Sequence, residues 1–157
     1  MNSQIATFAA GCFWGVEASF LKLKGVIDTR VGYTGGHFPE PDYQLVCTGT
    51  SGHAEAVRIV FDADVISYNE LLKEFWQMHD PTTPNRQGPD YGSQYRSAVF
   101  YHDVDQKATA EQTLSELQEM KKYDHMIVTE IVPAGEFYEA EEYHQRYYQK
   151  HNVNHCC

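Results

Sequence analysis

Cys12 is the side chain in this sequence best placed to act as a nucleophile. It follows an apolar run over residues 5–10, which predicts a short buried strand. Downstream, apolar residues recur at helical spacing, and a glycine is placed to end the helix: Phe13, Val16, Phe20, Leu23 and Gly25. A thiol at a helix N-terminus lies near unpaired N–H groups and the positive end of the helix dipole, which favour the thiolate. We therefore interpret Cys12 as a nucleophile; the alternative is a small buried residue that closes the strand–helix junction.

Two large aromatic residues, Phe13 and Trp14, directly follow this cysteine. They predict an apolar wall beside the sulfur atom. A nucleophile with a hydrophobic pocket is therefore the leading interpretation.

Glu55 is the second residue that could do chemistry. Residues 54–61 predict a strand, and their alternation places Glu55 on the same face as three apolar residues, Val57, Ile59 and Phe61. Burial raises the pKa of a carboxyl group, so Glu55 could hold a proton near neutral pH and act as an acid. The alternative is that Glu55 only marks the solvated end of the strand. Glu17, on the predicted helix of Cys12, is a weaker rival that we expect at the surface.

The elements that must position these residues alternate between strand and helix. Besides the segments above, strands are expected over 25–31, 95–102 and 126–132, and helices from Ser67, from Asp103 or Asp105, and over 139–150. This order predicts an α+β fold, a two-layer sandwich with a ferredoxin-like core, long loops and a C-terminal helix and tail. We expect a single domain over 1–157, with a mobile tail around 151–157.

Two predicted connections, 32–52 and 79–94, are long for a domain of this size and rich in glycine and proline. Loops of that length are either disordered or functional. Aromatic and charged residues punctuate both of them, Tyr43 in the first and Asp90 in the second among them. We therefore expect the two loops to help build a site.

The composition narrows the range of partners. The chain has 12 basic and 22 acidic residues and a net charge of −10, which argues against binding to nucleic acid or to an anionic membrane. Its four cysteines, at 12, 47, 156 and 157, do not form the spaced framework of a small secreted domain. Working thiols in a reducing cytoplasm are the better interpretation, and we expect a monomer.

These residues together resemble a known family, the peptide methionine sulfoxide reductases of the A type. The resemblance covers essentially the whole chain. It is carried by six stretches, Ala10–Gly15, Gly32–Gly36, Tyr43–Val57, His79–Thr83, Gly92–Ser97 and Glu142–Tyr147. Gly-Cys-Phe-Trp-Gly at 11–15 followed by Gly-His-Ala-Glu at 52–55 is a specific combination.

The resemblance implies a role for residues already singled out and for two more. Cys12 would attack the sulfur of a methionine sulfoxide and be left as a sulfenic acid. Glu55 would protonate the sulfoxide oxygen, with the hydroxyls of Tyr43 and Tyr95 as further hydrogen-bond donors. The roles of the two tyrosines depend on the resemblance alone.

The resemblance also implies how the substrate is held. Phe13 and Trp14 would hold its ε-methyl group, and Asp90 would orient it. An apolar cradle for the methyl group opposite polar donors for the oxygen selects one sulfoxide epimer, which in this family is the S form. Methionine sulfoxide, either in peptides and proteins or free, is the implied substrate, and neither a metal nor an organic cofactor is implied.

Recycling requires a reductant and, in many relatives, a second cysteine in a glycine-rich C-terminal segment. Here the candidates are the adjacent Cys156 and Cys157, one of which we expect to form a disulfide with Cys12 that thioredoxin then reduces. The alternative is an idle tail and direct reduction of Cys12 by external thiols. Cys47 is expected to be a small buried filler.

Two functions from other classes also fit a reactive cysteine. A thiol peroxidase could use Cys12 and the tail pair, although a peroxide hardly needs the apolar wall at Phe13 and Trp14. A binding module could recognise methionine, oxidised or not, without turnover. The histidines and cysteines at 151–157 also allow a zinc site, but no Cys-x-x-Cys pair elsewhere would complete one.

Overall fold

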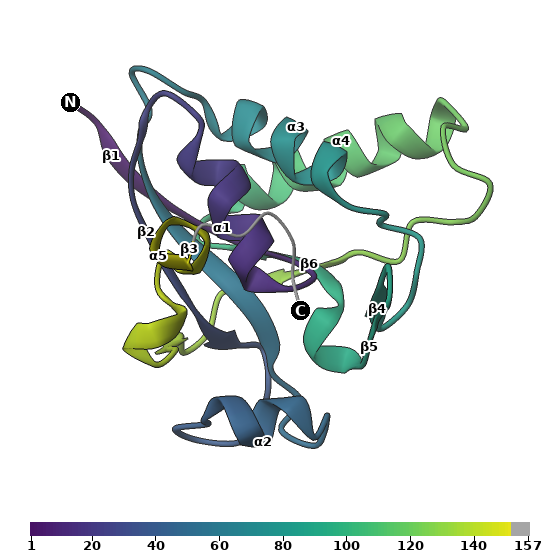
Figure 1. Ribbon diagram of the computed structural model, residues 1–157. Helices are drawn as coiled ribbons and strands as arrows, with labels where there is room; N and C mark the ends of the chain where they lie inside the picture. Colours follow the sequence, from purple (N-terminus) through teal and green to yellow (C-terminus); the bar gives the residue numbers. More distant parts are fainter. Residues whose placement is uncertain (152–157) are drawn as a thin grey trace.

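The computed structural model describes residues 1–151, and its class is the expected α+β. A six-stranded sheet has the order β7-β6-β1-β3-β2-β8 (Figure 1). Its strands are β1 (Ser3–Ala10), β2 (Val26–Thr34), β3 (Ala54–Asp62), β6 (Ser97–Tyr101), β7 (Glu130–Pro133) and β8 (Tyr138–Glu139). Neighbouring strands are antiparallel except for β6 and β7. A separate hairpin pairs β4 (Arg86–Gln87) with β5 (Asp90–Tyr91).

Three longer helices cover one face of the sheet (Figure 1). They are α1 (Phe13–Leu21), α3 (Tyr68–Met78) and α4 (Val104–Glu119). The central strands and two of these helices follow the order β1-α1-β2-β3-α3-β6, the βαββαβ order expected from the sequence. The shorter helices α2 (Tyr43–Cys47), η1 (Ser93–Tyr95), η2 (Glu142–His144) and α5 (Tyr147–His151) lie in the connections and near the C-terminus.

The main core fills the space between the sheet and the three helices. Phe8 of β1 lies at its centre, with its ring 5.3 Å from that of Phe20 on α1 and 5.2 Å from that of Phe75 on α3. The opposite face of the sheet carries a smaller cluster of Ala9, Ala54, Ala56, Ala98 and Phe100, covered by Val132, Ala134 and Phe137. Both faces of β3 are therefore buried at the end that carries Glu55.

Helix starts follow the sequence signals closely. Ser67 and Glu70 form the expected capping box at α3, and Asp103 caps α4 by accepting a bond from the N–H of Gln106. The predicted end of α1 was wrong, because the helix stops at Leu21. Gly25, with φ +103°, instead turns the chain into β2, where a Cβ would lie 2.6 Å from Ile66 Cγ2.

The largest difference from the sequence prediction lies near the C-terminus. A helix was expected over 139–150, but the chain forms β8, η2 and only the short α5. Tertiary bonds override the local helix preference here: the Ala140 N–H donates to the Val31 carbonyl, and the Gln145 side chain bonds both backbone groups of Val31. Arg146, with φ +54°, then separates η2 from α5. Two strand starts also differ, because 126–129 and Tyr95 lie outside β7 and β6.

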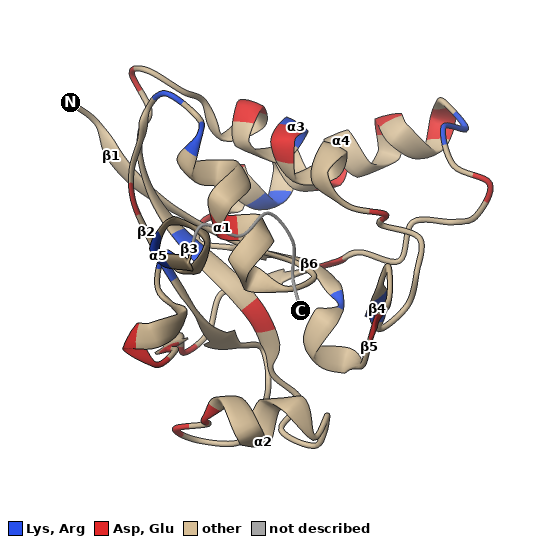
Figure 2. Cartoon of the chain, in the orientation of Figure 1, with Lys and Arg blue, Asp and Glu red and all other residues tan. Residues whose placement is uncertain are grey.

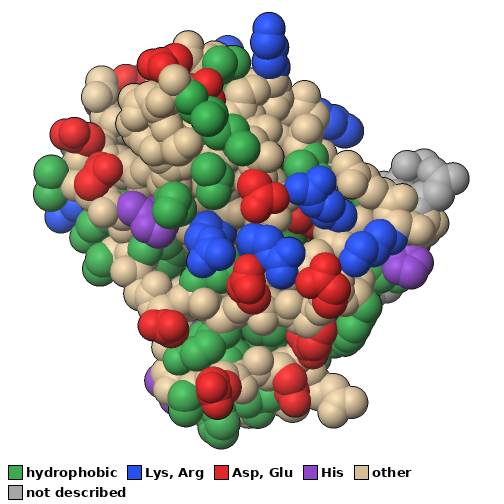
Figure 3. All heavy atoms as spheres, turned by 90° about the vertical axis from the view of Figure 1, so that its left-hand side faces the viewer, with side chains coloured by type: hydrophobic (Ala, Val, Ile, Leu, Met, Phe, Trp, Pro, Cys, Tyr) green, Lys and Arg blue, Asp and Glu red, His purple; other side chains and the backbone are tan. Residues whose placement is uncertain are grey.

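Ion pairs fasten this C-terminal segment to the sheet. Arg30 bonds Glu139 at 2.7 Å and Glu142 at 3.4 Å, and Arg146 bonds Asp28 at 3.0 Å. Basic and acidic side chains lie next to one another across this face in Figure 3. Figure 2 shows further acidic residues on α3, α4 and the loops. Exposed pairs of this kind contribute little individually. Within 1–151, no helix has the length and apolar character needed to cross a membrane.

Candidate active site

Cys12 lies at the predicted junction, as the residue that precedes the first turn of α1. It is half-buried, and its carbonyl accepts a bond from the N–H of Val16 at 3.4 Å. The turn before it depends on Gly11, whose φ is +104° and whose missing Cβ would lie 3.0 Å from the Gln87 side chain. The sulfur atom therefore stands at the N-terminal end of α1, where the helix dipole favours the ionised form of a reduced thiol.

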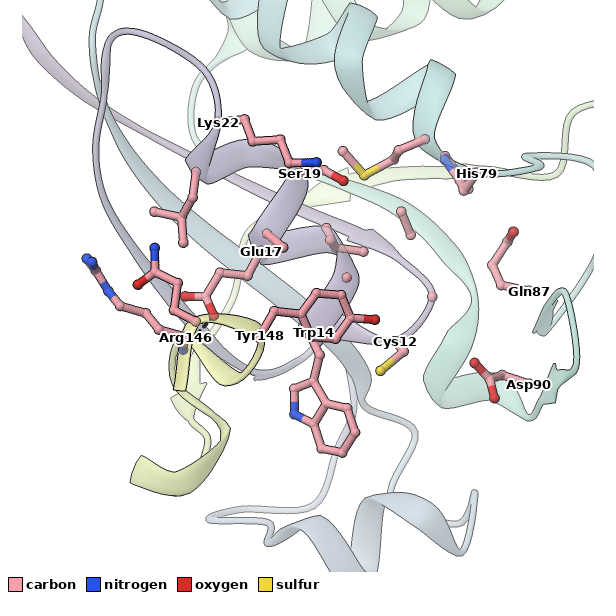
Figure 4. A pocket seen from close by; sticks show the side chains of 18 residues that line it. Cys12, Trp14, Glu17, Ser19, Lys22, His79, Gln87, Asp90, Arg146 and Tyr148 are labelled. Carbon is pink, nitrogen blue, oxygen red and sulfur yellow. Dashed lines mark hydrogen bonds between the residues drawn. The ribbon is translucent and has the colours of Figure 1, made fainter. Parts of the chain in front are cut away.

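A cavity of about 690 Å³ opens beside this sulfur atom. Trp14, Tyr148 and Asp90 line it together with Cys12, which lies between Trp14 and Asp90 in Figure 4. Of the described residues, the lining does not include Phe13, Glu55, Tyr43 or Tyr95. Cys12 thus borders the open cavity, and the predicted acid lies on the buried side of the junction.

Glu55 is almost completely buried, with 1% of its surface exposed. Its Oε1 accepts a hydrogen bond from the N–H of Phe13 at 3.1 Å, which ties it to the residue directly after Cys12. Its Oε2 is buried and has no hydrogen-bond partner among the described residues. Burial raises the pKa of Glu55 to about 8, and the nearby Asp90 adds to the rise while the Phe13 bond opposes it. The expectation of a desolvated carboxyl group, made from strand alternation, is confirmed.

Tyr43, Tyr95 and Asp90 come to the site from three different connections. Tyr43 begins α2, Tyr95 ends η1, and Asp90 begins β5. Burial raises the pKa of Tyr43 most, followed by its hydrogen bond to Cys47, and the charges of Glu55 and Tyr95 raise it further. The influence of Glu55 and Tyr95 on Tyr43 places these groups in one electrostatic cluster, in which the Tyr43 phenol stays protonated and able to donate.

The prediction for Cys47 was wrong. This residue is exposed, because it ends the short α2 within the 32–52 connection, outside the packed layers (Figure 1). Its thiol bonds the Tyr43 hydroxyl.

Phe13 and Trp14 both begin α1 and are buried, with 1% and 8% of their surfaces exposed. The indole of Trp14 stacks on the ring of Tyr147 with a centroid distance of 3.7 Å and an angle of 6°. Its Nε1–H donates to Nδ1 of His144 at 2.9 Å. An apolar wall is therefore present beside the sulfur, and residues from the C-terminal segment support it.

Glu17 was expected at the surface, and that expectation was wrong: only 1% of it is exposed. Oε2 accepts a bond from the Thr29 hydroxyl and Oε1 one from the N–H of Arg146, both at 2.7 Å. Burial raises its pKa, and these bonds oppose the rise. Its position four residues after Phe13 and three before Phe20, on the apolar stripe of α1, could have revealed the burial.

Comparison with known proteins decides the family. A family model for peptide methionine sulfoxide reductase matches residues 4–157.

The chain belongs to this family.

The reductase is 59% identical to a peptide methionine sulfoxide reductase MsrA of Methanosarcina acetivorans over 145 residues, which is 92% of this chain and 77% of that protein. Its structure resembles reduced Mxr1 from Saccharomyces cerevisiae, with a TM-score of 0.92, 36% identity and coverage of 99% of this chain and 90% of the other. Mxr1 in complex with Trx2 gives a TM-score of 0.66 and 29% identity over 93% and 85% of the two chains. The chain is therefore a methionine sulfoxide reductase, an oxidoreductase.

Three residues of the C-terminal segment, Glu141, His144 and Tyr147, contact residues of the candidate site. Glu141 accepts bonds from the hydroxyl of Tyr33 at 2.8 Å and the N–H of Tyr43 at 3.1 Å, and so joins β2 to α2. His144 bonds Trp14, and Tyr147 stacks on it. No local pattern points to these pairings, because each joins residues 98 to 133 positions apart.

Two expectations about the reductase concern its C-terminus. The predicted resolving residues, Cys156 and Cys157, lie outside the described residues, as does most of the zinc candidate set. Among residues 1–151, no group of three or more histidine, cysteine or acidic residues could hold a metal ion.

Proposed function

We propose that the reductase converts the S epimer of methionine sulfoxide, in peptides or proteins, to methionine. The observation that carries this proposal is the state of Glu55. The carboxyl group is buried, has a raised pKa, is held by the N–H of Phe13 next to Cys12, and keeps its second oxygen without a partner. A protonated carboxyl group in that condition is ready to give its proton to an incoming acceptor.

The first step is a two-electron transfer between sulfur atoms. The Cys12 thiolate attacks the electrophilic sulfur of the sulfoxide while Glu55 gives a proton to the sulfoxide oxygen. The S–O bond breaks as that oxygen passes to Cys12, which is oxidised to a sulfenic acid, and methionine leaves in its reduced form. Tyr43 and Tyr95 stabilise the developing charge on the oxygen as hydrogen-bond donors.

Epimer selection follows from two unlike walls. The indole of Trp14 and the ring of Phe13 contact the ε-methyl group of the substrate. The protonated Glu55 and the hydroxyls of Tyr43 and Tyr95 donate hydrogen bonds to the sulfoxide oxygen. Asp90 orients the remainder of the substrate from the cavity wall. Exchanging methyl and oxygen, as the R epimer would, buries an unpaired S–O group against aromatic carbon and leaves Glu55 facing a methyl group.

Recycling restores the thiolate of Cys12. The thiol of Cys156 or Cys157 displaces water from the sulfenic acid and forms a disulfide with Cys12, and a dithiol such as that of thioredoxin then reduces it. The structural likeness to Mxr1, which is known in complex with Trx2, supports thioredoxin as the reductant. We propose a cytoplasmic monomer, because the candidate site is built from one chain and thioredoxin chemistry belongs to a reducing compartment.

The decisive experiment is single-turnover reduction of the two separated epimers of N-acetyl methionine sulfoxide, with free thiols counted before and after. We expect turnover of the S epimer only, with two thiols lost per chain. Loss of only one thiol would still support sulfoxide reduction by Cys12, but it would exclude Cys156 and Cys157 from the mechanism. Equal turnover of both epimers would refute the selection argued here, and consumption of hydrogen peroxide with no sulfoxide turnover would favour a thiol peroxidase.

The rate of the first step should depend on pH through Glu55. Because its pKa is raised to about 8, the proton-donating form predominates below that pH and is lost above it. We expect the single-turnover rate to fall about tenfold per pH unit above pH 8. Rapid-quench measurements from pH 6 to 10 test this, and a rate that stays level to pH 10 would exclude Glu55 as the acid.

Removing both tail cysteines should separate the two half-reactions. In the C156S/C157S variant, the first turnover should match wild type, whereas steady-state turnover with thioredoxin should fall by about tenfold or more. The matched control is C47S, which also removes a thiol and should keep thioredoxin recycling. Normal recycling in the double variant would show that external thiols reduce Cys12 directly.

A further inference from the structure

The cavity beside Cys12 is much larger than one methionine sulfoxide side chain. Its volume is about 690 Å³, within the range of about 300–1,000 Å³ that is typical of sites for drug-sized ligands. Its walls come from α1, the end of α3, the β4–β5 hairpin and α5. Because Cys12 lies at the N-terminal end of α1, the reacting sulfur borders only one part of the cavity, and the remainder is open to other groups of a substrate.

The cavity follows α1 away from the reacting sulfur. Gly15, Ser19 and Lys22 line it in succession, and their spacing of three to four residues places them on one face of the helix. Lys22 caps the C-terminal end of α1, and Figure 4 shows it at the opposite end of the helix from Cys12. At a helical rise of about 1.5 Å per residue, Lys22 and Cys12 are about 15 Å apart along the helix axis.

Several polar groups in the cavity lining are already neutral or paired. Glu17 accepts bonds from the Thr29 hydroxyl and from the N–H of Arg146. The guanidinium of Arg146 in turn forms an ion pair with Asp28. Burial lowers the pKa of His79 to about 4, so its ring is neutral near pH 7. None of these groups is available to select a charged substrate.

Two charged groups of the lining remain, at opposite ends of the cavity. Asp90 lies beside Cys12, and Lys22 lies at the far end of α1. Neither forms an ion pair with another residue in the part of the chain from 1 to 151. The Lys22 side chain is exposed and keeps its charge at the cavity edge. An unpaired cation in this position attracts an anionic group of the molecule that fills the cavity.

We propose that this cavity binds the polypeptide around the oxidised methionine, and that Lys22 selects substrates with an acidic residue at a set distance from it. An extended chain rises about 3.3 Å per residue, so the distance of about 15 Å corresponds to four or five residues. With the sulfoxide at Cys12, a glutamate or aspartate four or five positions away meets the Lys22 ammonium. This inference depends on the proposed function, because it requires methionine sulfoxide at Cys12.

The overall charge of the chain makes this preference distinctive. The net charge of −10 attracts basic peptides in general. A higher rate for acidic peptides, confined to one distance from the methionine, therefore identifies a local contact. An acidic residue directly next to the methionine would lie near Asp90 and should bring no gain.

Synthetic peptides with the S epimer of methionine sulfoxide test the preference. Each carries one glutamate, glutamine or lysine, placed next to the methionine or four or five positions away, on either side because a chain can cross the cavity in two directions. Rapid-quench single turnover of the reduced full-length protein at subsaturating peptide gives the second-order rate constant of the first step without recycling. We expect glutamate to exceed glutamine about threefold at four or five positions on one side, and not in the adjacent position.

Charge reversal at Lys22 gives the sharpest comparison. K22E should invert the preference, so that lysine peptides react faster than glutamate peptides. The matched control K24E makes the same change in net charge at an exposed lysine outside the cavity lining, and it should keep the wild-type preference. Raising the salt concentration from about 0.02 M to about 0.5 M should remove the preference of the wild type. N-acetyl methionine sulfoxide is too short to reach Lys22 and should react equally with all three proteins.

The possible failures are distinguishable. Peptide rates that do not depend on charge, or a preference for glutamate that survives in K22E, would overturn the role of Lys22. Slower formation of the Cys12 disulfide in K22E with unchanged peptide rates would assign the cavity to the C-terminal tail and would also overturn it. If none of the three proteins reduced N-acetyl methionine sulfoxide, the proposed function itself would be refuted.

Discussion

Replacing Cys12 by serine should abolish sulfoxide reduction, lowering the single-turnover rate by about 10⁴-fold or more. A serine hydroxyl does not ionise near neutral pH, so the α1 N-terminus that favours the thiolate has no comparable anion to stabilise. The oxygen atom also cannot take over the sulfoxide oxygen as sulfur does in forming a sulfenic acid. Rapid-quench assays with the separated epimers measure this directly.

The same variant also distinguishes catalysis from recognition. Cys12 is half-buried and serine is nearly isosteric, so the C12S protein should fold and still bind the sulfoxide. The variant C47S, which changes an exposed thiol outside the cavity lining, is the matched control and should retain turnover. If C12S kept full function, the chain would act as a binding module and the nucleophile assignment would fail.

Replacing Glu55 by glutamine should slow the first step by about 10²–10⁴-fold, the range typical of a lost general acid. Glutamine can still accept the Phe13 N–H bond and fill the buried space, but it has no proton to transfer. The fall in rate above pH 8 should disappear with the carboxyl group. E17Q is a suitable control, because Glu17 is an equally buried acid on α1 that should leave that fall in place.

The same substitution should stabilise the fold near neutral pH. A carboxyl group whose pKa is raised from 4.5 to about 8 keeps its proton in the native state while the unfolded chain ionises. The free energy of unfolding of the wild-type protein therefore falls as pH rises from about 4.5 to about 8. The E55Q variant does not undergo this loss, because glutamine does not ionise. We expect E55Q to gain about 1–3 kcal/mol at pH 7 in urea titrations. If E55Q showed this gain in stability and also a wild-type single-turnover rate, Glu55 would have a structural role only.

The parts of the fold that local patterns describe were predictable from sequence. The apolar run before Cys12 and the helical spacing after it located the β1–α1 junction, and the capping box located the start of α3. Strand alternation placed Glu55 on the buried face of β3, and the structure confirms its desolvation. Each of these features depends on residues within a few positions of one another.

The hydrogen-bond partners of Glu17 and the contact between His144 and Trp14 have a different origin. Glu17 is buried because Thr29 and the N–H of Arg146 satisfy its oxygens, and no charge pattern along the helix foretells such partners. The expected helix over 139–150 failed for the same reason, since its backbone is used at the edge of β2.

The sequence by itself predicted a nucleophile at Cys12, a buried acid at Glu55 and the order of the elements, because periodicity and caps are local properties of the chain. Only the tertiary structure decided what supports them: Glu141 under Tyr43, His144 at the edge of Trp14 and Tyr147 on its face. These contacts join residues 98 to 133 positions apart through single side-chain bonds or a stacked pair. Such bonds follow no periodicity, and they form only when folding brings these distant residues together.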